Sequence, residues 1–124
     1  MSERDPLEPF DWKHRIFLLF DAPESVDRLR AAEAAINERQ VLWFVTGGDA
    51  LETNYAGELP ADFASRLDAY RRSRPGTIEV VLIGKDGGVK SRDPKLDLEA
   101  LFARIDAMPM RRAERREQAG RPGP

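Results

Sequence analysis

The stretch VVLIGKDGGVKSR, from Val80 to Arg92, decides the fold because it specifies a β-hairpin. Its first four residues are apolar and mostly β-branched, which is typical of a buried strand. The following Asp86-Gly87-Gly88 supplies residues that tolerate the positive φ angles of a tight reversal. The sequence therefore predicts two antiparallel strands joined by a charged turn.

Composition indicates one globular domain and excludes thiol chemistry. The 124 residues are 41% hydrophobic and 34% charged, which suits one packed core with a well-solvated surface. Twenty basic and 22 acidic residues give a net charge of -2, so we expect neither a nucleic acid nor a membrane as partner. With no cysteine, the chain has no disulfide, thiolate nucleophile or CxxC redox motif.

The ends of the chain are expected to lie outside the domain. The first ten residues, MSERDPLEPF, carry mixed charges, two prolines and no apolar core of a signal peptide, so the expected location is the cytoplasm. We predict a disordered or extended lead over residues 1–10, a single domain over 11–117 and a disordered tail over 118–124.

Strand-like and helix-like segments alternate through the first half of the chain. Apolar runs at Arg15–Phe20 and Val41–Thr46 predict two buried strands, and Ser25 is the expected N-cap of one helix that reaches about Glu38. These segments form a β-α-β unit, for which parallel strands and a right-handed crossover are expected.

The rest of the chain completes the order β-α-β-α-β-β-α. The polar segment 50–60 is expected to be a loop, followed by a helix that Pro75-Gly76 ends. After the hairpin, Asp97 is the expected cap of a third helix, and residues 110–118 would add one or two polar turns. This is the order of thioredoxin, so we predict an α/β thioredoxin-like fold: a mixed four-stranded sheet, with its first and third strands central and helices on both faces.

Two motifs at a fixed separation carry a family resemblance. LIGKDGGVK, from Leu82 to Lys90, and IDAMPMRRAE, from Ile105 to Glu114, together with Trp12 and Arg15, resemble the P-DUDES thioredoxin-like family, domain of unknown function 4174. The resemblance implies a thioredoxin-like or peroxiredoxin-like fold, usually without redox cysteines, with no cofactor and no established enzymatic activity. Family relatives are often exported, whereas the N-terminus here favours the cytoplasm.

One pole of the predicted fold is where redox relatives carry cysteines. Here it holds the turn from Asp21 to Ser25, which has no thiol to activate. Pro75 lies near the position of a cis proline in such folds, although an ordinary helix stop explains it equally well.

The opposite pole should gather the charged motifs, because the first two strands begin there and the third ends there. The candidate site residues at this pole are Arg15, Arg39, Lys85, Asp86, Gly87, Gly88, Lys90, Arg111 and Arg112.

Two interpretations of this pole remain open. In the structural one, the cations of Arg15, Arg39, Arg111 and Arg112 pair with carboxylates and pin the C-terminal segment over the sheet end; the expected carboxylates are Glu38, Asp86, Asp106 and Glu114. In the binding one, Lys85, Lys90, Arg111, Arg112 and the amides of Gly87 and Gly88 hold a carboxylate, a phosphate or the acidic segment of a partner protein.

The expected function is that of a non-catalytic binding or scaffold module. The alternative is a small-anion-binding protein or enzyme that uses the basic pole around Lys85, Lys90, Arg111 and Arg112. We expect no catalytic residue, metal ligand or cofactor, and leave the partner as a protein or a small anion.

Overall fold

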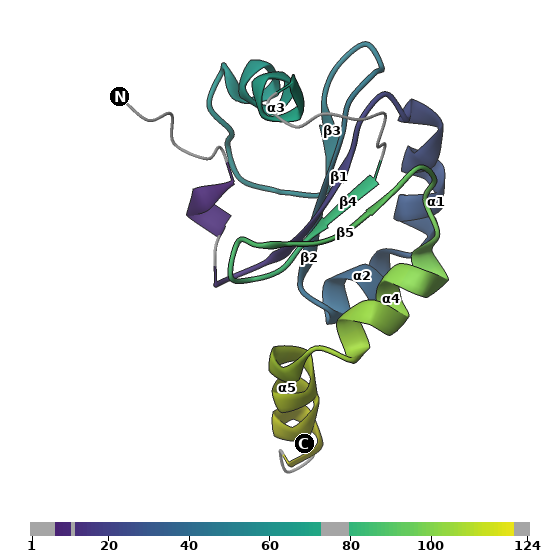
Figure 1. The fold of residues 1–124 in the computed structure, drawn as a ribbon, viewed down its shortest axis with the longest axis vertical. Helices are drawn as coiled ribbons and strands as arrows, with labels where there is room; N and C mark the ends of the chain where they lie inside the picture. Colours follow the sequence, from purple (N-terminus) through teal and green to yellow (C-terminus); the bar gives the residue numbers. More distant parts are fainter. Residues whose placement is uncertain (1–6, 11, 73–79, 121–124) are drawn as a thin grey trace.

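The computed structural model describes residues 7–10, 12–72 and 80–120 (Figure 1). A mixed sheet runs through the fold in the order β3-β2-β1-β4-β5. The strands are β1 (Arg15–Leu19), β2 (Val41–Val45), β3 (Glu52–Thr53), β4 (Val80–Ile83) and β5 (Val89–Asp93).

Strand pairing confirms the β-α-β unit and the hairpin. β1 is parallel to β2 and antiparallel to β4, and β4 pairs antiparallel with β5 across the predicted turn. All five residues of β1 and all four of β4 are buried, and both strands lie inside the sheet as predicted.

The predicted count of four strands is wrong, because the segment expected to be a loop contains β3. Glu52 and Thr53 pair antiparallel with the end of β2. The Asn54 side chain continues the pairing: its oxygen accepts from the Trp43 amide at 2.8 Å and its nitrogen donates to the Val41 carbonyl at 3.1 Å. Two polar, half-buried residues at a sheet edge have no hydrophobic alternation, so the sequence carried no strand signal here.

The α-helices are α1 (Val26–Ala31), α2 (Glu33–Glu38), α3 (Phe63–Arg72), α4 (Leu98–Asp106) and α5 (Pro109–Gly120). Two short 3₁₀ helices, η1 (Glu8–Phe10) and η2 (Pro23–Ser25), precede β1 and α1. The predicted helix end at Pro75-Gly76 and the isomer of the Pro75 peptide bond lie outside the described residues.

The first predicted helix is wrong in two respects. It is divided at Ala32, whose φ of -100° and ψ of 18° interrupt the helix. Ser25 makes no capping hydrogen bond, because it already has helical angles as the last residue of η2. The cap predicted at Asp97 is confirmed, with its carboxylate accepting from the Ala100 amide at 3.1 Å.

Helices lie near both ends of the described residues. Leu7 and Phe10 are buried in the core, whereas the sequence predicted a disordered or extended lead at these positions. α5 extends over 12 residues instead of one or two turns and includes residues 118–120 of the expected tail.

Helices cover both faces of the sheet, as predicted (Figure 1). Alternate residues of β1 face opposite ways: Phe17 and Leu19 pack with α1, α2 and α4, whereas Ile16 and Leu18 pack with η1 and α3. The sheet is therefore buried on both sides, and its two ends are the places where polar groups gather.

Candidate functional site

The charged motifs meet at the end of the sheet where β1 and β2 begin and β4 ends. Arg15 is the first residue of β1, Arg39 lies two residues before β2, and Lys85 lies two residues after β4. α5 lies at this end, below the sheet in Figure 1. We call the cluster the charged pole; its members are Arg15, Glu38, Arg39, Lys85, Asp106, Arg111 and Glu114.

Glu114 on α5 is the centre of the charged pole. Its carboxylate accepts a two-pronged pair of hydrogen bonds from the Arg15 guanidinium, both 3.2 Å long, and a third from Lys85 Nζ at 2.7 Å. Arg15 also donates to the Arg39 carbonyl at 2.9 Å, and Lys85 to the Gln40 side chain. One carboxylate thus joins α5 to β1 and to the hairpin.

A second two-pronged pair joins α4 to the start of β2. Arg39 donates to both oxygens of Asp106, at 3.1 and 2.9 Å, and to the Ala35 carbonyl at 3.0 Å. Its guanidinium also lies 4.5 Å from the centre of the Phe102 ring, which favours a cation over an aromatic face. Phe102 is not among the site residues predicted from the sequence, because an apolar residue on a helix indicates packing and not an ion contact.

Arg111 inserts from α5 into the same pole. It donates to the Glu38 carbonyl at 3.2 Å and to the Glu38 carboxylate at 3.3 Å, and lies 3.5 Å from Asp106 and 3.6 Å from Glu114. Arg15 and Arg111 are each only 1% exposed, so their charges depend on these partners for compensation.

The charged pole has four cations and three carboxylates. The guanidinium Nε atoms of Arg15 and Arg111 are buried and make no hydrogen bond. Because the cations outnumber the carboxylates by one, the cluster keeps one excess positive charge. Every side chain in it nevertheless takes part in at least one ion pair.

The hairpin turn forms its own contacts beside the charged pole. Asp86 pairs with Lys90 at 2.9 Å, where pairing with an arginine was expected. The Gly88 amide donates to the Asp86 carboxylate at 2.9 Å and the Gly87 amide to the Gly84 carbonyl at 3.0 Å, so both amides suggested for anion binding already have acceptors. Arg112 is exposed on α5, and its binding role stays a prediction.

The structure thus brings together part of the predicted site. Arg15, Arg39, Lys85 and Arg111 converge on carboxylates of the charged pole, and the structural interpretation named three of those carboxylates correctly. Asp86 and Lys90 pair with each other within the turn instead.

Ion pairing favours the ionised form of two carboxylates of the charged pole, those of Glu114 and Asp106. Burial alone would raise the pKa of Glu114, but hydrogen bonds and charge from Arg15 and Lys85 outweigh it and lower the pKa from its usual 4.5. Hydrogen bonds from Arg39 similarly lower the pKa of Asp106. The pKa of nearby His14 is lowered by burial and by the cations of Lys85 and Lys13, so the neutral imidazole is favoured.

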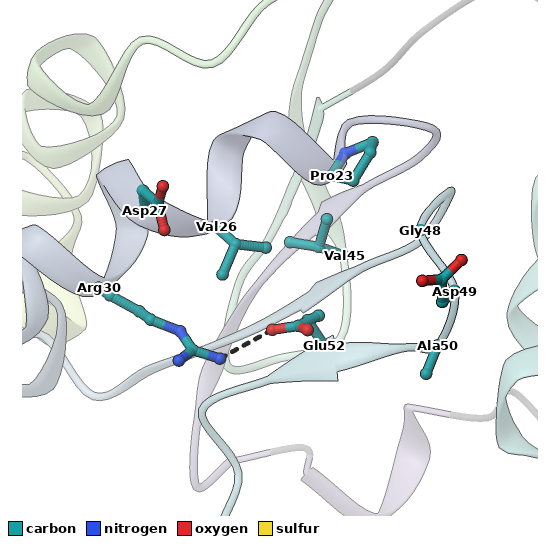
Figure 2. A pocket seen from close by; sticks show the side chains of 9 residues that line it. All are labelled: Pro23, Val26, Asp27, Arg30, Val45, Gly48, Asp49, Ala50 and Glu52. Atoms are coloured by element: carbon teal, nitrogen blue, oxygen red, sulfur yellow. Dashed lines mark hydrogen bonds and ion pairs between the residues drawn. The ribbon is translucent and has the colours of Figure 1, made fainter.

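A pocket of about 370 Å³ lies at the other end of the sheet, where the parallel strands β1 and β2 finish (Figure 2). Open α/β sheets commonly bind ligands beyond the carboxyl ends of their strands. The pocket is lined by Pro23, Val26, Asp27, Arg30, Val45, Gly48, Asp49, Ala50 and Glu52. The sequence analysis placed residues 21–25 at this pole and did not include Arg30 or Glu52. Glu52 was missed because it lies on β3, which the sequence did not indicate.

The rim of this strand-end pocket is held by close backbone contacts. Asp21 and Gly47 have positive φ angles of 55° and 101°, and an added Cβ on Gly47 would lie 2.6 Å from the Asp21 Cα. Thr46 links the two strand ends, accepting from the Asp21 amide on its hydroxyl and from the Ala22 amide on its carbonyl, both at 3.1 Å. The pocket therefore has a fixed rim.

Among residues 7–10, 12–72 and 80–120, no group of three or more His, Cys, Asp or Glu side chains is arranged to hold a metal ion. Within the same ranges, no helix is long and apolar enough to cross a membrane.

These features define a cysteine-free mixed α/β domain with a cluster of paired charges at one sheet end and a small pocket at the other. The sequence profile of the family described as Domain of unknown function (DUF4174) matches residues 6–114, and the chain belongs to that family. The match ends at Glu114, the centre of the charged pole. No curated protein and no solved structure matches the chain.

Proposed function

We propose that this chain is a thioredoxin-like domain that acts as a non-catalytic binding or scaffold module. The thioredoxin-like assignment is supported by the parallel β1–β2 unit, the antiparallel β4–β5 hairpin and the helices on both faces of the sheet. The resemblance to the P-DUDES family supports the same fold. The chain has no cysteine to serve a thiol reaction.

The observation that carries the scaffold role is the capture of Glu114 by Arg15 and Lys85. Each cation of the charged pole has a carboxylate partner, so the cluster is built to hold α5 against the sheet end. Three arginines of α5 stay exposed: Arg112, Arg115 and Arg116. A helix held in this way would present these arginine side chains to an acidic segment of a partner protein.

The variant Arg111→Ala tests the scaffold role. Its control is Arg112→Ala, at the next position of the same helix. Arg111 is buried in ion pairs, whereas Arg112 is exposed, so only the first change should lower the free energy of unfolding, by about 3 kcal/mol. Urea denaturation measures both variants. Equal stability of Arg111→Ala and the wild type would contradict a structural role for the charged pole.

A small-anion site at the same pole is the second candidate function, favoured by the excess of four cations over three carboxylates. Thermal unfolding with phosphates, nucleotides and dicarboxylates tests it, because a ligand at 100 times its dissociation constant adds about 2.7 kcal/mol of stability. An increase with one anion that Arg111→Ala abolishes would favour binding over scaffolding. The absence of any increase across the panel would eliminate this candidate.

The expected cytoplasmic location belongs to the same proposal. Fractionation of cells that express the tagged chain would test it, and recovery from the medium or an envelope fraction would refute it.

A further inference from the structure

We propose that the strand-end pocket binds an organic monocation, an alkyl guanidinium or alkyl amine. This site lies at the end of the sheet opposite the charged pole and does not depend on the role proposed for α5. The argument rests on the charge, the apolar surface and the size of the pocket.

The charge of the lining favours a cation. The carboxylates of Asp27, Asp49 and Glu52 line the pocket together with one guanidinium, that of Arg30. Arg30 reaches from α1 to Glu52 on β3 at 2.7 Å (Figure 2), and this pair neutralises itself. Asp27 and Asp49 are exposed and make no hydrogen bond or ion pair through their side chains among the described residues, so the lining carries an excess of two carboxylates over the single guanidinium.

The apolar part of the lining favours an aliphatic stem on that cation. Val26 and Val45 lie next to each other at the centre of the pocket in Figure 2, and Pro23 and Ala50 line it as well. Lysine and arginine side chains bury their methylene groups on such surfaces while the charged end stays at the polar margin. Val45 itself is only 1% exposed, so the stem of an alkyl guanidinium would lie on Val26, Pro23 and Ala50, with its charge at the carboxylates.

Size and rigidity favour a small ligand bound in a preformed site. A volume of about 370 Å³ is at the lower end of the roughly 300–1,000 Å³ typical of small-molecule pockets. The close approach of Gly47 to Asp21 fixes the loop that carries Gly48 to Ala50, so little ordering would accompany binding.

The test uses n-butylguanidinium as the probe, with neutral n-butylurea and anionic butyrate as shape-matched controls. Titration is followed by the methyl NMR signals of Val26 and Val45. We expect n-butylguanidinium to shift both signals saturably, and the urea and the carboxylate to bind at least tenfold more weakly. No saturable shift with the cation, or equal shifts with the urea, would overturn the proposal.

The variant Asp27→Asn/Asp49→Asn should weaken n-butylguanidinium binding by roughly fivefold or more, because exposed charge pairs are each worth about 0.2–1 kcal/mol. Its control is Glu33→Gln/Asp68→Asn, which removes the same charge from exposed helical positions outside the pocket. An equal loss in both double variants would show a general charge effect and no site.

The same cation could come from a free metabolite or from an arginine side chain of a partner protein. Titration with the peptide acetyl-Ala-Arg-Ala-amide separates these sources. Binding at least as tight as that of n-butylguanidinium supports a protein side chain as the ligand, and binding of n-butylguanidinium alone supports a free small molecule. Binding of neither excludes the site.

Discussion

At the scale of single residues, the importance of a side chain follows from what it contacts. Glu114 is one of two glutamates on α5, yet it alone accepts from Arg15 and Lys85. Glu117 lies three residues further on and is exposed. The two positions therefore make a matched pair for measuring the ion pairs of the charged pole.

Glu114→Gln should lower the free energy of unfolding by about 3 kcal/mol, because it leaves the buried Arg15 without its carboxylate. Glu117→Gln should change it by less than about 0.5 kcal/mol. Chemical denaturation at pH 7 measures both, and similar midpoints for the two variants would contradict the role assigned to Glu114.

The same carboxylate predicts how stability depends on pH. Because the pKa of Glu114 is lower in the folded chain than its usual 4.5, its contribution is complete above about pH 4.5 and is lost as the pH falls through the folded pKa. Asp106 acts in the same direction. Unfolding free energies between pH 3 and pH 7 should fall less steeply toward acid in Glu114→Gln than in the wild type, and identical slopes would contradict the shift.

Two neighbouring glycines at the strand-end pocket should respond differently to alanine. Gly47→Ala places a Cβ 2.6 Å from the Asp21 Cα at a φ of 101°, and should cost about 2–3 kcal/mol. At Gly48 the nearest atom, in Pro23, would be 3.5 Å away, which is an ordinary contact, so Gly48→Ala should be tolerated. Thermal melting of both variants checks this, and equal melting temperatures would refute it.

At the scale of elements, helix starts show where local sequence is decisive and where context overrides it. Asp97 and Ser25 are both typical cap residues, and only Asp97 caps a helix. Pro23 begins the turn η2 directly before α1, so Ser25 is already helical and its backbone cannot take the extended cap conformation.

Asp97→Ala should therefore cost about 1 kcal/mol of stability, whereas Asp97→Asn should restore most of it, because asparagine caps equally well. Ser25→Ala should cost clearly less than Asp97→Ala. Equilibrium denaturation ranks the three variants by their free energy of unfolding. A larger loss of stability in Ser25→Ala than in Asp97→Ala would contradict the assignment of Asp97 as the cap.

At the scale of the whole molecule, α5 differs from the rest in how it is attached. The sheet and the other helices share apolar cores, while α5 reaches the body through Arg111 and Glu114. Ion pairs at a partly exposed end are weaker than apolar packing, so α5 should be a region of lower local stability.

Hydrogen exchange tests this difference. In Glu114→Gln at neutral pH, amides of α5 should lose protection by at least tenfold more than amides of β1, which is buried on both faces. Glu117→Gln should leave both unchanged. A uniform loss across α5 and β1 would mean that the helix and the sheet unfold as one unit.

The sequence by itself determined the features that depend on local pattern: the hairpin from Val80 to Arg92, the buried strands β1 and β2, and the cap at Asp97. Only the tertiary structure decided the features that depend on neighbours distant in the chain. β3 exists because β2 offers it an open edge, and Glu114 is central because two elements direct cations at it. Local apolar periodicity indicates which residues of a segment are buried. The partners of a strand or of a charged side chain are set by how distant segments pack together.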